Sequence, residues 1–116
     1  MKKVIYVFRH GETDANIEHR MQGWLDVPLN ANGVAQAQVL AQKLADVNFD
    51  VMYSSPLSRA LDTARAVVGN QQIVLNGDLR EWNMGDFCGH IVKLTDNPAD
   101  TPIDMSSDVI YAPYAL

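Results

Sequence analysis

An arginine and a histidine, Arg9 and His10, stand together where a short apolar segment ends. Residues 4–8 before them are β-branched or aromatic, a pattern that predicts a buried parallel strand. Ligands of open α/β sheets bind beyond the carboxyl ends of such strands. Gly11 lets the backbone approach a ligand closely, and a guanidinium fork suits a phosphate. These residues indicate a phosphate site, although a histidine that only caps a loop fits the same tetrapeptide.

Two further residues could complete this chemistry. Arg59 is predicted about one turn into the helix after the second strand, so it can converge with the loop around His10 at the carboxyl edge of the sheet. The alternative is a surface arginine paired with Asp62. Glu81 follows the third predicted strand, where a carboxylic acid could protonate a leaving alkoxide. A lone glutamate in an exposed turn is its alternative.

The elements that must position these residues alternate along the chain. Strands are predicted at residues 4–8, 51–53 and 72–75, and two helical patterns lie between them. The order strand, helix, strand, helix, strand predicts an α/β fold with a parallel sheet. The apolar faces of the two helices are Ala37, Leu40, Ala41 and Leu44 in the first, and Ala60, Leu61, Ala64 and Val68 in the second.

The predicted helix ends rest on capping residues. Asn30 is expected as the N-cap of the first helix. For the second helix, Ser55 is expected as the N-cap, Pro56 as the first helical residue and Gly69 as the terminator. Beyond Gly89, prolines and spaced aspartates predict a loop with at most one short helix.

Composition limits the classes of partner. The 116 residues are 47% hydrophobic and 20% charged, which is typical of one globular domain. Four aspartates and no basic residue follow Lys93, so this tail carries most of the net charge of -5. Without a basic stripe, a nucleic-acid partner is not expected. No apolar run is long enough for a membrane span or a signal peptide, and the single Cys88 fits a reducing compartment, so a cytoplasmic protein is predicted.

Four motifs, in order and spacing, resemble the histidine phosphatase superfamily, the phosphoglycerate-mutase-like proteins. The resemblance covers residues 3 to about 90 and implies a three-layer sandwich with a mainly parallel sheet, here truncated at the C-terminal side. The matching residues are Arg9-His10-Gly11-Glu12-Thr13 with Asn16, Gln22-Gly23 with Asp26-Val27-Pro28-Leu29, Ser54-Ser55-Pro56-Leu57-Ser58-Arg59-Ala60 with Thr63-Ala64, and Leu79-Arg80-Glu81 with Gly85-Asp86-Phe87 and Gly89.

The resemblance also implies roles for individual residues. His10 would be the nucleophile that accepts the phosphoryl group, and Glu81 would be the proton donor. The remaining implied residues bind the phosphate or the substrate, and they are Arg9, Asn16, Gln22, Gly23 and Arg59. No metal or other cofactor is implied, because arginines provide the charge clamp. The implied activity is hydrolysis of a small phosphorylated substrate, a phosphomonoester, so the chain is predicted to be an enzyme.

The sequence departs from the family at two points. A second pocket histidine, in a Ser-His-Gly-Gly-like segment on a later strand, has no counterpart here. His19 and His90 are interpreted as loop histidines, since neither follows an apolar strand or precedes paired glycines. Cys88 stands where many relatives have an acidic residue, and no neighbouring base marks it as a catalytic thiol.

These departures leave open several interpretations of organisation and function. One partial domain over residues 1–116 is expected, with a motif-bearing α/β part at 1–90 and an irregular acidic tail at 91–116. In the family the strand with the second histidine lies between the first two strands, so open sheet edges and self-association are expected. Phosphoglycerate mutase-type transfer and a non-catalytic phosphate-binding fragment remain as alternatives to hydrolysis.

Overall fold

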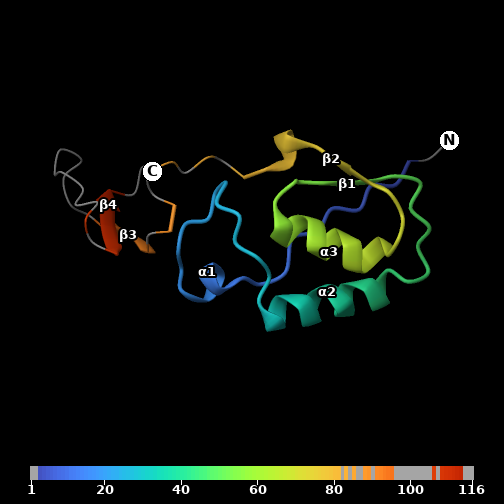
Figure 1. The fold of residues 1–116 in the computed structure, drawn as a ribbon, viewed down its shortest axis with the longest axis horizontal. Helices are drawn as coiled ribbons and strands as arrows, with labels where there is room; N and C mark the ends of the chain where they lie inside the picture. The colour runs from blue at the N-terminus through green and yellow to red at the C-terminus, as the bar shows by residue number, and fades with distance from the viewer. Residues whose placement is uncertain are drawn as a thin grey trace.

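The structure, a computed structural model, describes residues 3–81, 83, 85, 88, 89, 91–95, 106 and 108–113. Its helices are α1 (Asp14–Ile17), α2 (Ala31–Lys43) and α3 (Ser58–Val68), with a short 3-10 helix at Gly77–Leu79. Its strands are β1 (Met52–Ser54), β2 (Ile73–Leu75), β3 (Ile91–Thr95) and β4 (Val109–Pro113). Figure 1 shows β3 and β4 at one end of the molecule and β1 and β2 towards the other.

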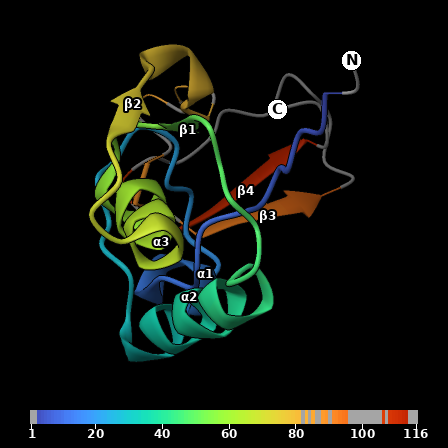
Figure 2. The ribbon, with the colours of Figure 1, turned by 90° about the vertical axis from the view of Figure 1, so that its right-hand side faces the viewer.

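Helix α3 connects two parallel strands. In the β1–β2 pair, Met52 lies opposite Ile73 and Ser54 lies opposite Leu75. Helix α3 contacts both β1 and α2, so the two longer helices lie on the same side of this strand pair (Figure 2). The strand–helix–strand unit confirms the predicted α/β fold with parallel strands.

The helix ends agree with the sequence in two places and differ in one. The Asn30 side chain accepts a hydrogen bond from the Gly33 N–H at 2.8 Å, and Gly69 ends α3 with a φ of 60°. The predicted start of α3 at Pro56 is wrong, because the helix begins at Ser58 and Ser55 is not its N-cap. A carboxylate from another loop, that of Asp26, accepts the Ser58 N–H at 2.7 Å and so takes the place of a local cap.

The predicted first strand is also wrong. Residues 4–8 are not a strand, and no strand pairing joins them to any other part of the chain that the structure describes. Val4, Ile5 and Val7 are 66%, 84% and 91% exposed. The β-branched composition favours an extended backbone, but a strand also requires a neighbour for its N–H and C=O groups, and here β1 pairs with β2 instead.

The tail is more regular than its prolines suggested. In place of a loop with at most one short helix, β3 and β4 pair in parallel from Ile91 opposite Val109 to Thr95 opposite Pro113. Each strand begins with two β-branched residues, a feature that favours strands and that the sequence interpretation underweighted. Pro113 is tolerated because it is the last residue of β4. The other two prolines of the tail, Pro98 and Pro102, lie outside the described residues.

The buried interior of the described residues is small and largely polar. Its apolar members are Ala15, Ala37, Met52 and Ala64, and its polar members are Thr13, Ser54, Ser55, Arg59 and Thr63. The radius of gyration of 17.3 Å exceeds the ~13 Å of a compact domain of this length. Specific hydrogen bonds therefore contribute much of what holds the site loops in place.

Candidate active site

The loop after residues 4–8 is held against the first turn of α2 by two glycines. A Cβ on Gly11 would overlap the carbonyl oxygen of Gly33, and a Cβ on Gly33 would overlap the carbonyl oxygen of Glu12. The Gly11 N–H then donates to Thr63 Oγ1 at 3.0 Å, which joins the loop to α3. Two residues without side chains thus permit the close approach that fixes this loop.

His10 lies on this loop with a defined tautomer. Its Nδ1 is 2.6 Å from the carbonyl oxygen of Gly11. A carbonyl only accepts, so Nδ1 carries the hydrogen, and the lone pair is on Nε2. The half-buried His10 ring can therefore present an unprotonated nitrogen to a ligand.

Three of the predicted site residues line one open hollow. Arg9, His10 and Asn16 lie around a volume of about 310 Å³, together with Gly11, Glu12 and Gln36. The Asn16 Oδ1 accepts the Thr13 N–H at 2.9 Å in the capping box of α1, so the Asn16 amide presents its N–H donors elsewhere. A guanidinium, an imidazole and an amide are thus gathered where an anion could bind.

Arg59 is buried and faces backbone carbonyls rather than Asp62. Only 2% of it is exposed, and its Nη1 and Nη2 donate to the carbonyls of Leu25 and Gly23 at 2.6 and 2.7 Å. The alternative of a surface arginine is therefore wrong. Burial lowers the pKa of Arg59, while the nearby carboxylate of Glu81 opposes that shift.

Thr63 joins Arg59 to the His10 loop, although Arg59 does not line the hollow around His10. The Thr63 hydroxyl accepts from Gly11 N–H and donates to the Arg59 carbonyl at 2.7 Å. Thr63 is 2% exposed, so its bond from the Gly11 N–H fixes the loop against α3, while its bond to the Arg59 carbonyl, inside α3, orients the hydroxyl. Thr63 belongs to the matching motif, but the sequence interpretation assigned no role to it. Its place one turn after Arg59 was the only indication that it could connect α3 to the His10 loop.

The loop with Gln22 and Gly23 makes a second connection. Gln22 Oε1 accepts a hydrogen bond from the Thr13 hydroxyl at 2.8 Å, and the Gln22 carbonyl lies 3.3 Å from the Cys88 thiol. Gly23 has a φ of 50°, which favours glycine, and its carbonyl holds Arg59. The predicted residues thus lie on two groups of loops, one around His10 and one around Arg59, and hydrogen bonds join the groups.

Glu81 is exposed and belongs to the Arg59 group. Its carbonyl accepts the indole N–H of Trp24 at 2.6 Å. The guanidinium of Arg80 lies over the same indole, with 3.7 Å between the guanidinium carbon and the ring centroid. The sequence interpretation missed Trp24, and only its position directly after Gln22 and Gly23 could have indicated it.

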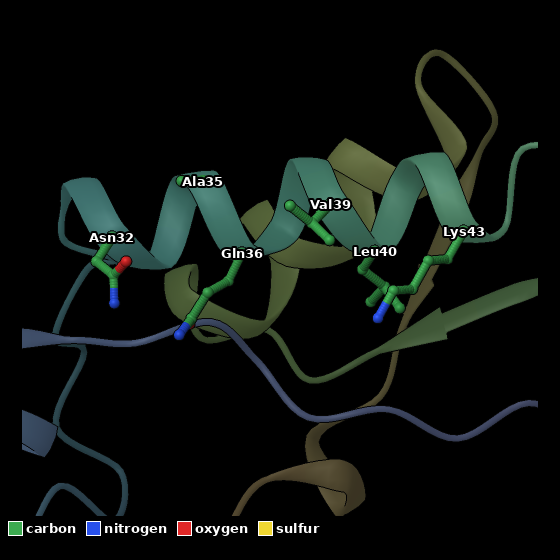
Figure 3. A pocket seen from close by; sticks show the side chains of 6 residues that line it. All are labelled: Asn32, Ala35, Gln36, Val39, Leu40 and Lys43. Carbon is green, nitrogen blue, oxygen red and sulfur yellow. The ribbon is translucent and has the colours of Figure 1, made fainter.

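Neither the second hollow nor His19 adds a residue to the candidate active site. A second hollow, of about 390 Å³, follows one face of α2 and contains none of the predicted site residues (Figure 3). His19 is exposed with a φ of 56°, as a loop histidine would be, and His90 lies outside the described residues.

In the parts of the chain that the structure describes, no three histidine, cysteine or acidic side chains gather as metal ligands. Among the same residues, no helix has the length and apolar composition that crossing a membrane requires.

A match to a protein-family model shows which family this chain belongs to. The model of the histidine phosphatase superfamily (branch 1) matches residues 5–111. The chain belongs to this superfamily. It is 43% identical over 93 residues to phosphoglycerate mutase-like protein 4 of Arabidopsis thaliana, covering 77% of this chain and 40% of that protein. It is 40% identical over 85 residues to the adenosylcobalamin/alpha-ribazole phosphatase of Escherichia coli, covering 72% and 42% of the two chains.

A similar solved structure gives the same result for the fold. The phosphoserine phosphatase of Entamoeba histolytica, in complex with 3-phosphoglyceric acid, is 42% identical with a TM-score of 0.65. The match covers 70% of this chain and 41% of that one. The phosphoglycerate-mutase-like fold class is therefore confirmed, and the chain spans less than half the length of these relatives.

Proposed function

We propose that this histidine phosphatase chain hydrolyses a small phosphorylated substrate, a phosphomonoester, through a phosphohistidine on His10. The observation that carries the proposal is the hollow in which Arg9, His10 and Asn16 meet, with His10 Nδ1 bonded to a carbonyl. That bond leaves the Nε2 lone pair as the nucleophile. Arg9 and Asn16 supply donors for the equatorial phosphate oxygens.

In the first step, His10 Nε2 attacks phosphorus and the bond from phosphorus to the ester oxygen breaks. The leaving alkoxide takes a proton from the Glu81 carboxyl, which becomes a carboxylate. Arg59 does not line the hollow around His10, but its charge lies close enough to influence Glu81, and we assign to it the long-range stabilisation of negative charge on the transferring group. Arginines perform the charge neutralisation in this scheme, so no metal takes part in it.

In the second step, a water molecule attacks the phosphohistidine. Its proton passes to the Glu81 carboxylate, the P–N bond breaks, and inorganic phosphate leaves with His10 restored. Gln22 and Gly23, on the loop that holds Arg59, are assigned to substrate binding. Dividing the displacement into two steps replaces one difficult reaction with two easier ones.

The names of the similar proteins support both hydrolysis and the first alternative, phosphoglycerate mutase-type transfer. The similar proteins of Escherichia coli and Entamoeba histolytica are named phosphatases, whereas others are named probable phosphoglycerate mutases. A mutase would return the phosphoryl group to another substrate hydroxyl rather than to water. A non-catalytic phosphate-binding fragment is the second alternative, because the proposed phosphate-binding residues are present while the family's second pocket histidine has no counterpart in the sequence.

The decisive experiment is phosphoryl labelling. Incubation of the chain with a ³²P-labelled phosphomonoester should give an acid-labile adduct that His10→Ala abolishes and that His19→Ala, the matched control, leaves intact. Steady release of phosphate then supports the phosphatase, whereas binding of inorganic phosphate with neither adduct nor turnover supports the non-catalytic fragment. Label that persists in His10→Ala would contradict the assignment of the nucleophile.

Two further properties belong to this proposal. Self-association is proposed through residues 4–8, because Val4, Ile5 and Val7 are exposed and the backbone of this segment has no strand partner among the described residues. A cytoplasmic location is proposed because the thiol of Cys88 is free, as is usual in reducing compartments. Fractionation of cells that express the tagged chain tests the location, and recovery from an oxidising compartment would contradict it.

A further inference from the structure

Trp24 makes two contacts with the segment that ends at Glu81. Its indole N–H donates to the Glu81 carbonyl at 2.6 Å, and the Arg80 guanidinium lies over its ring. Arg80 is itself held, because its Nε donates to the Gly77 carbonyl at 3.0 Å. One indole therefore holds both the Arg80 side chain and the backbone carbonyl of Glu81.

The same indole is tied to the rest of the site by its position in the chain. Trp24 stands between Gly23 and Leu25, the two residues whose carbonyls accept from Arg59. A change in the Trp24 contacts would thus move Glu81 relative to Arg59. No other side chain among the described residues donates a hydrogen bond to the Glu81 backbone.

We propose that Trp24 is a positioning residue that sets the place of the Glu81 carboxyl as proton donor. This inference rests on the proposed function. It also names a substrate class, since a well-placed acid matters most where the leaving group is a basic alkoxide. The site is therefore suited to alkyl phosphates, and Trp24 contributes little where the leaving group is a stabilised phenolate.

The kinetic test compares an alkyl phosphate, glycerol 2-phosphate, with an activated aryl ester, 2,4-dinitrophenyl phosphate. Glu81→Gln should slow the alkyl substrate by about 10²–10⁴-fold and the aryl substrate much less. Trp24→Phe keeps an aromatic ring at this position but removes the N–H donor. It should slow hydrolysis of the alkyl substrate selectively, by about tenfold. Tyr53→Phe, which alters an exposed aromatic residue on β1, should change neither rate.

Equal losses on both substrates in Trp24→Phe would overturn the inference, because a merely structural role affects every substrate alike. Failure of the wild-type chain to hydrolyse either ester or to form the His10 adduct would instead count against the proposed function. The two failures are therefore distinguishable.

A measurement without turnover tests the contacts directly. Trypsin cleaves after Arg80, and the stacked, hydrogen-bonded state should protect that bond. Trp24→Ala should raise the cleavage rate at Arg80 about tenfold, as expected for loss of a cation–π contact and a hydrogen bond. Cleavage after Lys43, at the end of α2, serves as the internal control and should not change. Unchanged protection at Arg80 would overturn the inference whether or not the chain is active.

Discussion

Arg59 is a buried cation whose guanidinium stabilises the fold and, in the function we propose, also provides charge for the site. Its two hydrogen bonds to the carbonyls of Gly23 and Leu25 position the loop that also contains Gln22. Burial lowers the pKa of Arg59, but a guanidinium starts from so high a pKa that it remains a cation at neutral pH. A single substitution should therefore affect folding and phosphate binding together.

Arg59→Ala should lower the free energy of unfolding by about 3 kcal/mol, because two carbonyls lose a charged donor. It should also remove the stabilisation that vanadate or phosphate gives in thermal melts. Arg59→Lys retains the charge but not the bidentate geometry, so it should fall between the alanine variant and the wild type. Equal melting shifts with and without Arg59 would contradict its role in binding the anion.

At the scale of single residues, the sequence identified the types of side chain better than their contacts. Arg9, His10 and Asn16 lie together as the motif indicated, because they are close in sequence and one short loop carries them. The partners of Arg59 could not be predicted, since they are backbone carbonyls more than 30 residues away. The Trp24 contacts were missed for the same reason.

At the scale of elements, α3 begins with a cap from another part of the chain. The Asp26 carboxylate accepts both the N–H and the hydroxyl of Ser58 at 2.7 Å, and these bonds lower the pKa of Asp26. Because the pKa is lower in the folded state, the resulting stabilisation is present above the unfolded pKa of ~3.9. It is lost as the pH falls through the folded pKa.

Asp26→Ala should therefore reduce the free energy of unfolding by about 1 kcal/mol at pH 7, a typical value for an N-cap. The difference from the wild type should shrink as the pH is lowered from 5 towards 2, roughly the interval over which a paired aspartate loses its charge. Denaturant melts across this pH range measure the effect. The exposed Asp50 provides the matched control, and an identical pH dependence in Asp26→Ala and the wild type would contradict the cap.

The elements that the sequence predicted correctly are those fixed by local rules. Asn30 and Gly69 mark helix ends through bonds and dihedral angles within a few residues. Residues 4–8 and the β3–β4 pair were misjudged because pairing depends on a distant neighbour, which local composition does not specify. Asp26 and Ser58, 32 residues apart, show the same limit at the start of α3.

At the scale of the whole molecule, apolar side chains are exposed where strand pairing is absent. Val4, Ile5 and Val7 are among the most exposed large apolar residues of the chain, while the buried apolar core of the described residues contains only Met52 and three alanines. Exposed apolar surface and unpaired backbone groups both favour association between chains. A small buried core also provides little hydrophobic stabilisation.

The chain alone should therefore be weakly stable, slow in turnover, and associated through residues 4–8. Val7→Lys places a charge on the 91% exposed position of this segment, which should shift the protein towards the monomer. Val34→Lys, on the exposed side of α2, adds the same charge elsewhere and should leave the association unchanged. Light scattering after size exclusion measures the mass, and hydrogen exchange measures protection at residues 4–8. A wild-type monomer with a cooperative melt, protected amides in this segment and multiple turnovers would contradict the prediction.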